Sequence, residues 1–430
     1  MKNKEHNTSV VKAIPLALQH VVAMVVGCVT VPRVVGSAAG LGADEILILM
    51  QASLLCAGIA ILIHTVGKKG FGSGLPIIVG SGFAFMPTLI SIATSQGLDY
   101  VLGAQLIGSI VGIIVGVGFK KIRFLFPPVV TSSIIIVVGI SLYKTAIDYM
   151  AGGFNSATYG SSLNWIIAIV TVAAVILFQN FGKGAIKVSA TLLGLIVGYI
   201  LAACLGQVDA SQIFSSAAFS IPQPLHFGMS FSVGAIVSLS VVFIINAIQD
   251  MGQFEATASG VYNRVATDSE ISGGVIGDNI ASMLGSVVGG VPVAAAGQNV
   301  GIVTQTKVTD KIVFILAALI IIVTSFVPML TSVFLTIPLP VLGGATIGVF
   351  GSIAMTGIRM LANAGLTPRN LSIAGISVAA AVGVATVSLK GVSPFAQTPE
   401  FIQTIFGGSE LVIVAFVAII LNLVLPKEKN

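Results

Sequence analysis

The sequence predicts an all-α polytopic membrane protein, with 14 transmembrane segments arranged as two inverted seven-segment repeats. Three observations predict this fold class. Only 8% of the 430 residues are charged, whereas a soluble domain has about 25% and needs them to cover its surface. Hydrophobic residues make up 56% of the chain. The 49 glycines favour close helix packing and helices broken near a functional centre. This composition excludes a soluble enzyme and a nucleic-acid-binding protein.

Each membrane span needs about 20 apolar residues. The apolar stretches of the chain lie at 14–32, 45–66, 74–95, 101–119, 126–147, 163–180, 186–205, 230–254, 272–291, 292–306, 311–332, 337–358, 370–389 and 409–425. If the N-terminus is cytoplasmic, 17 of the 20 Lys and Arg residues fall in cytoplasmic loops, as the positive-inside rule requires. We therefore expect a multi-pass protein of the cytoplasmic membrane with both termini in the cytoplasm.

The third and tenth segments differ from ordinary spans. Small residues and a proline interrupt both, in Gly80–Pro87 and in Val291–Gly301. Each pattern predicts a short extended strand followed by a half-helix, a backbone that is tolerated at membrane depth only around a cavity. The fifth and twelfth segments open with prolines, and Pro338 follows Pro127 by 211 residues. Because seven segments is an odd number, the second repeat must be inverted.

Polar side chains gather in the eighth segment. At helical spacing Asn246, Gln249, Asp250 and Gln253 share an arc of about 100°. The arc predicts a cavity wall, although hydrogen bonds between helices would also explain it. Asp278 in the ninth segment either orders a half-helix by accepting backbone N–H bonds or acts in coupling. His64 and His226 fall near the membrane edges, and we expect no functional role for them.

The interrupted segments and the polar arc predict one binding site near the middle of the membrane. Two half-helix N-termini would point at it, and Gln249, Gln253 and Gln298 would supply paired donors and acceptors. Phe83 offers a flat apolar face. This combination suits a planar, polar, uncharged heterocycle. The residues predict no metal centre and no organic cofactor.

Four motifs resemble those of the nucleobase–ascorbate transporters, also called the nucleobase:cation symporter-2 family. Residues 298–307 read QNVGIVTQTK and fit the family signature at every fixed position. Gln19-His20 is similar to the family's Gln-His pair, Gly80–Phe85 to its third-segment strand, and Asp278 to its ninth-segment acid. The resemblance extends over about residues 13–425.

The resemblance implies a core domain from residues 13–120 and 228–332, and a gate domain from residues 121–205 and 333–426. Movement of the core against the gate would carry a purine such as xanthine or uric acid inward, together with H+ or Na+. It also implies a homodimer in the lipid bilayer, no enzymatic activity and no nucleic-acid partner. The implied substrate-binding residues are Phe83, Gln249, Gln253, Gly297, Gln298 and Asn299. Candidates for coupling or support of the site are His20, Asn246, Asp250 and Asp278.

One departure from the family concerns coupling. Gln249 stands where the family usually has a Glu that bonds the base and is tied to the coupling ion, and an amide does not titrate. We hypothesise that Asp250, at the edge of the same arc, takes over the charge. A uracil or other pyrimidine permease stays open as an alternative, and so, less favoured, does an anion transporter of related fold. A membrane-embedded enzyme would need an acid pair or a metal cluster, and a channel would not need two interrupted helices.

Overall fold

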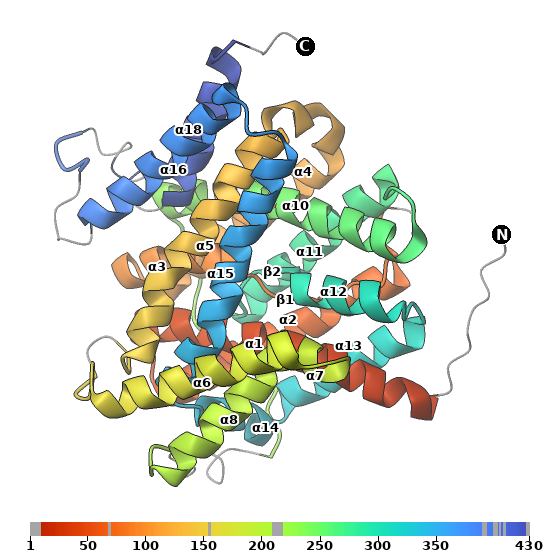
Figure 1. The fold of residues 1–430 in the computed structure, drawn as a ribbon, viewed down its shortest axis with the longest axis vertical. Helices are drawn as coiled ribbons and strands as arrows, with labels where there is room; N and C mark the ends of the chain where they lie inside the picture. Colours follow the sequence, from red (N-terminus) through yellow and green to blue (C-terminus); the bar gives the residue numbers. More distant parts are fainter. Residues whose placement is uncertain are drawn as a thin grey trace.

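The computed structural model describes residues 10–67, 70–153, 156–208, 218–388, 394–398, 403, 406 and 410–426. This part of the chain is predominantly helical (Figure 1). The helices of the first half are α1 (Val10–Ala38), α2 (Ala43–Val66), α3 (Met86–Ser95), α4 (Leu98–Ile122), α5 (Pro128–Met150), α6 (Ser162–Phe181), α7 (Ala185–Val188) and α8 (Ala190–Cys204). Those of the second half are α10 (Val233–Tyr262), α11 (Asp268–Val288), α12 (Gly297–Thr306), α13 (Lys311–Phe326), α14 (Pro328–Leu335), α15 (Leu339–Asn363), α16 (Pro368–Ser388) and α18 (Glu410–Val424).

Nine helices in the described residues are long and apolar enough to cross a membrane. The number is ten if α13 and α14, which meet at a bend of 86°, form one span. Shorter apolar helices cover Phe83–Ser95, Ala190–Cys204 and Glu410–Val424. Every apolar stretch expected from the sequence contains helix, but several are too short or too interrupted to qualify as spans by length. The chain is thus a multi-pass membrane protein.

Two short strands lie near the centre of the molecule (Figure 1). The first, β1 (Val79–Ser81), pairs antiparallel with β2 (Val293–Ala295), with Val79 opposite Ala295 and Ser81 opposite Val293. Both strands are fully buried. Backbone hydrogen bonds between them satisfy groups that would otherwise be unpaired in the apolar interior. A ten-residue helix follows each strand, α3 in the first half and α12 in the second.

Proline and serine define where several long helices begin. Pro127 caps α5 and Pro338 caps α15, and each helix has a proline in its first turn. A proline there costs nothing, because the first N–H groups of a helix have no partner within it. Ser232 caps α10 by accepting a hydrogen bond from the Ala235 N–H. Thr267 and Glu270 form a capping box at the start of α11.

The helices pack in two groups. In one, α2 lies against α1, α11 and α13, and α4 packs on α10 and α11. In the other, α5 lies along α15, α6 contacts α8 and α15, and α16 packs on α18 and α5. Figure 1 shows α5 and α15 side by side across the middle of the molecule, with the two strands to the right of α15.

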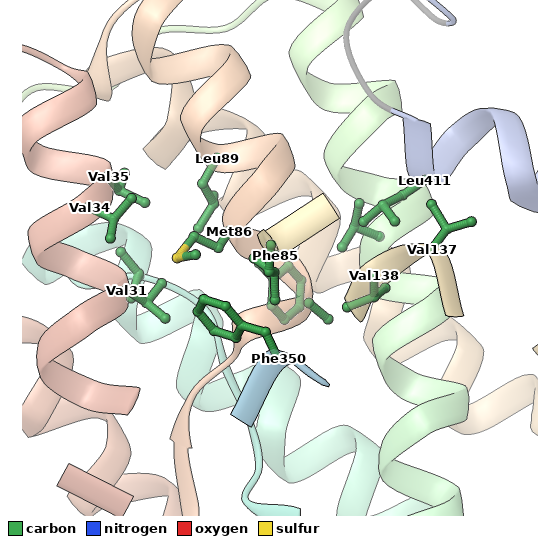
Figure 2. Close-up of a cluster of buried hydrophobic side chains, with 14 of the residues drawn as sticks. Val31, Val34, Val35, Phe85, Met86, Leu89, Val137, Val138, Phe350 and Leu411 are labelled. Atoms are coloured by element: carbon green, nitrogen blue, oxygen red, sulfur yellow. The ribbon is translucent and has the colours of Figure 1, made fainter. Parts of the chain in front are cut away.

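Buried apolar side chains join the two groups (Figure 2). Val31 of α1 and Phe85 and Met86 near the start of α3 meet Phe350 of α15 and Val138 of α5. All five side chains are almost completely buried. This contact holds the two groups together next to the segment that follows β1.

Candidate functional site

A cavity of about 630 Å³ lies between the two groups of helices. Its volume is in the range of sites for small molecules. One wall comes from α1, α10 and the segments around β1 and β2, and the other comes from α5, α6, α8 and α15. A ligand in the cavity would therefore contact both groups at once.

The polar residues of α10 divide between the cavity and the protein interior. Asn246, Gln249 and Gln253 line the cavity, with Gly252 and Ala256 beside them. Asp250 is 1% exposed and bonds to β2 instead. The expected polar arc thus forms a cavity wall through its three amides, while its one acid supports the strand behind that wall.

The strand segments bring an aromatic ring and a glycine to the same cavity. Phe83 lines it and packs edge-on against Phe350, with 5.3 Å between ring centroids. Gly297, the first residue of α12, lies opposite Gln253. A β-carbon at Gly297 would come within 3.2 Å of the Gln253 Nε2 atom, so a larger residue there would require a small shift of this amide.

Several hydrogen-bonding atoms at the cavity wall have no partner. The Asn246 amide nitrogen donates to Asp250 at 2.6 Å, so its oxygen is left to accept from elsewhere. Asn246 Oδ1, Gln249 Oε1 and Ser81 Oγ are buried and unpaired in the described structure. An unpaired buried acceptor costs about 1–3 kcal/mol. None of the described residues that line the cavity carries a charge.

The cavity is open at one end and closed at the other. Gln179 of α6 and Thr356 of α15 line it near the ends of their helices, and both are exposed. At the other end the ring of Phe83 packs against Phe350, which belongs to the buried apolar cluster. Beyond that cluster, Arg33 of α1 donates to the carbonyl oxygen of Ile337 at 2.6 Å. Side chains of both groups therefore close this end.

His20 and Asn299 lie behind the cavity and bind each other. His20 Nδ1 is 2.6 Å from Asn299 Oδ1, and both side chains are 1% exposed. The His20 ring also lies against Phe314, with 5.1 Å between ring centroids. This pair fixes α12 to α1. The side chain of Gln298, which the sequence places in the site, lies outside the described residues.

The sequence missed the partner of Asp278. His64 Nε2 is 2.9 Å from Asp278 Oδ1, and His64 Nδ1 is 2.9 Å from Ser73 Oγ. The His64 side chain is completely buried, although it lies in the last turn of α2. The sequence did not predict its two partners, and the absence of a functional role for His64 stays a prediction. The backbone N–H bond expected for Asp278 is made by Asp250, which accepts from Ala295 at 3.0 Å. Helical spacing alone does not reveal a partner 214 residues away.

Comparison with known proteins matches residues 11–390 to the Permease family model that groups xanthine and uric acid permeases. The chain belongs to this family. The permease is 31% identical to the xanthine permease of Bacillus subtilis over 96% of its own length and 93% of the relative's. It is 33% identical to the uric acid permease PucK of the same organism, over 97% and 96% of the two chains.

The fold of the permease is also found among transporters of other families. It matches the transmembrane domain of the cyanobacterial bicarbonate transporter BicA with a TM-score of 0.57. The match covers 84% of this permease and 97% of that domain at 16% sequence identity. At this identity the likeness concerns the fold alone.

Proposed function

We propose that this permease takes up a purine nucleobase of the xanthine or uric acid type across the cytoplasmic membrane by ion-coupled symport. The observation that carries the proposal is the uncharged cavity, which is lined by the amides of Asn246, Gln249 and Gln253 and by Phe83. Oxopurines are planar and present N–H and C=O groups along their edges. Amides both donate and accept, so they complement such an edge, and the aromatic ring covers its face.

The xanthine and uric acid permeases among its relatives support the same substrate class. The bicarbonate transporter with a similar fold suggests an anion instead. Basic side chains favour an anion site, and the described lining has none. This favours a neutral base over an anion.

In this proposal the two groups of helices act as core and gate. The core contains residues 13–120 and 228–332 and the gate residues 121–205 and 333–426, in 14 segments that form two inverted repeats. With the termini in the cytoplasm, the open end of the cavity, near Gln179 and Thr356, faces inward. The described conformation would then be the one that releases substrate. Two chains would form a homodimer through their gate domains, and this contact would hold the gate domain in place.

Phe83, Gln249, Gln253, Gly297 and Gln298 would contact the base. Asn299 and His20 would support the site, because their mutual hydrogen bond holds α12 against α1. Asp250 and Asp278 would serve coupling by H+ or Na+.

Uptake of radiolabelled xanthine into proteoliposomes tests the proposal, with uric acid, guanine and uracil as competitors. We expect saturable uptake in which xanthine or uric acid competes best. Strongest competition by uracil would favour the pyrimidine alternative. Absence of uptake and of binding for all four bases would overturn the proposed function.

A further inference from the structure

The cavity is longer than one purine base. Along α15 its lining extends from Gly348 to Met360, which is about 18 Å at the rise of an α-helix. Along α10 it extends from Asn246 to Ala256, about 15 Å on the same scale. A two-ring base, with bonds of about 1.3–1.5 Å, measures roughly 8 Å between its outermost atoms. A base bound at Phe83 and Gln249 therefore leaves part of the cavity unfilled.

The unfilled part is the inward half of the cavity, next to its open end. Phe83 packs against Phe350, so a base on the Phe83 ring lies near the level of Phe350 on α15. Thr356 also lines the cavity, and it follows Phe350 by six residues, or about 9 Å along the helix. A base whose ring covers Phe83 therefore ends short of Thr356.

The packing of α6 against α8 determines which side chains surround this inward half. A β-carbon at Gly194 of α8 would overlap with Val175 of α6, and a β-carbon at Gly198 of α8 would overlap with Thr171 of α6. Later residues of one helix thus meet earlier residues of the other. The two helices therefore run antiparallel, in a register that continues towards the open end of the cavity.

Continued by one turn, this register places Gln179 of α6 opposite the start of α8, where Ser189 and Thr191 lie. All three residues line the cavity. The Gln179 side chain is exposed and the other two are half-buried, and none of the three side chains has a hydrogen-bond partner in the described structure. A carboxamide and a hydroxyl both donate and accept. The start of α8 and the end of α6 therefore offer free donors and acceptors to a ligand.

Two hydroxyl oxygens of α15 add acceptors to the same part of the wall. Ser352 Oγ donates to the carbonyl oxygen of Gly348 and Thr356 Oγ1 donates to that of Ser352, each at 2.8 Å. Both protons are used within the helix, but a hydroxyl oxygen has two lone pairs and still accepts. Ile353 and Met360 supply apolar surface beside them, and the described lining carries no charge. A few polar groups set in apolar surface suit an uncharged planar ligand.

We propose that the gate carries a second, weaker binding site for the same oxopurine at the inward end of the cavity. This mouth site consists of Gln179, Ser189, Thr191, Ser352 and Thr356. The inference rests on the proposed function. Each hydrogen bond to the base replaces one to water, so its net gain is small and the site is weak. A base that leaves the amides of α10 would bind here before it enters the cytoplasm, which divides its release into two smaller steps.

Exchange of radiolabelled xanthine, measured from each face of the membrane separately, tests the mouth site. Everted membrane vesicles preloaded with unlabelled xanthine present the cytoplasmic face to the medium, and right-side-out vesicles present the outer face. Gln179→Ala should raise the half-saturating concentration about fivefold in everted vesicles, the effect of one neutral hydrogen bond, and change it less than about twofold in right-side-out vesicles. Thr191→Val, which removes the hydroxyl and keeps the shape, should act in the same direction.

Asn180→Ala is the matched control. Asn180 is the next residue of α6, it is exposed and does not line the cavity, and its amide donates to the carbonyl oxygen of Ile176 at 2.9 Å. This substitution should change neither half-saturating concentration. Gln249→Ala, in the inner substrate site, should raise both.

An equal effect of Gln179→Ala at the two faces, or no effect at either, would overturn the mouth site and leave the proposed function standing. Opposite shifts at the two faces would also overturn it, because they would mean a changed balance between inward-open and outward-open molecules. If Gln179→Ala does not fold, the same criteria apply to Thr191→Val and Ser189→Ala. Absence of exchange for every base in the wild type would instead overturn the proposed function.

Discussion

At the scale of single residues, the polarity of the cavity comes from amides. Gln249 and Asn246 each have one buried acceptor without a partner, and both lie on the α10 wall. Such atoms lose their bonds to water on folding, at a cost of about 1–3 kcal/mol each.

Gln249→Ala should weaken substrate binding more than it weakens the fold. Removal of one neutral hydrogen bond costs about 1 kcal/mol, which corresponds to a roughly fivefold higher Kd. Binding of xanthine by calorimetry measures the effect. The exposed residue Gln96 supplies the control Gln96→Ala, which should leave Kd unchanged. An equal Kd for Gln249→Ala and the wild type would contradict the assignment of this amide to the site.

His20→Ala should act on stability. It leaves the Asn299 Oδ1 atom without its partner at 2.6 Å, and an unpaired buried acceptor costs about 1–3 kcal/mol. We expect the free energy of unfolding in detergent to fall by that amount, whereas the exposed His226→Ala should change it by less than about 0.5 kcal/mol. If His20→Ala keeps the free energy of unfolding of the wild type but binds xanthine much more weakly, His20 instead contacts the substrate.

At the scale of elements, close contact between helices depends on small residues. Gly139 of α5 lies directly against the backbone of Ala354 in α15, and a β-carbon there would overlap with it. Gly351, on the same α15, has open space where a β-carbon would be. The two glycines therefore differ in what they contribute to the α5–α15 pair.

Gly139→Ala should force α5 and α15 apart. Overpacking of this kind typically costs about 1–3 kcal/mol. Gly351→Ala should leave stability unchanged or raise it by up to about 1 kcal/mol, because alanine is the better helix former. Thermal unfolding of the two variants in detergent measures the difference. Equal destabilisation by both substitutions would show that overlap between α5 and α15 is not the cause of the lost stability.

The elements also show how far sequence reasoning extends. The proline and glycine patterns placed extended backbone at Gly80–Pro87 and Val291–Gly301, where the structure has β1 and β2. Local composition suffices there, because the backbone itself is unusual. It does not suffice for Asp250, since helical spacing gives the direction of a side chain but not the element that it meets. The pairing of His64 with Asp278 and the 86° bend between α13 and α14 depend on packing between distant segments.

At the scale of the whole molecule, the closed end of the cavity joins the two groups of helices. Arg33 of α1 donates to the carbonyl oxygens of Ile337 at 2.6 Å and Phe334 at 3.4 Å, at the turn that leads from α14 into α15. A charge-assisted hydrogen bond is worth about 1.5–3 kcal/mol. Opening of this end requires that the contact break, so Arg33 should stabilise the closed conformation.

Arg33→Met should therefore shift the population of molecules toward a conformation in which this end of the cavity is open. Val341 of α15, four residues after Ile337, is completely buried, and Val341→Cys provides a position for labelling by a membrane-impermeant thiol reagent. In a Cys204→Ser background, which removes the exposed native thiol, Val341→Cys alone should react slowly. Adding Arg33→Met should raise the labelling rate about tenfold or more, because loss of 1.4 kcal/mol changes an equilibrium tenfold. An unchanged rate would mean that the apolar cluster around Phe85 and Phe350, and not Arg33, keeps this end closed.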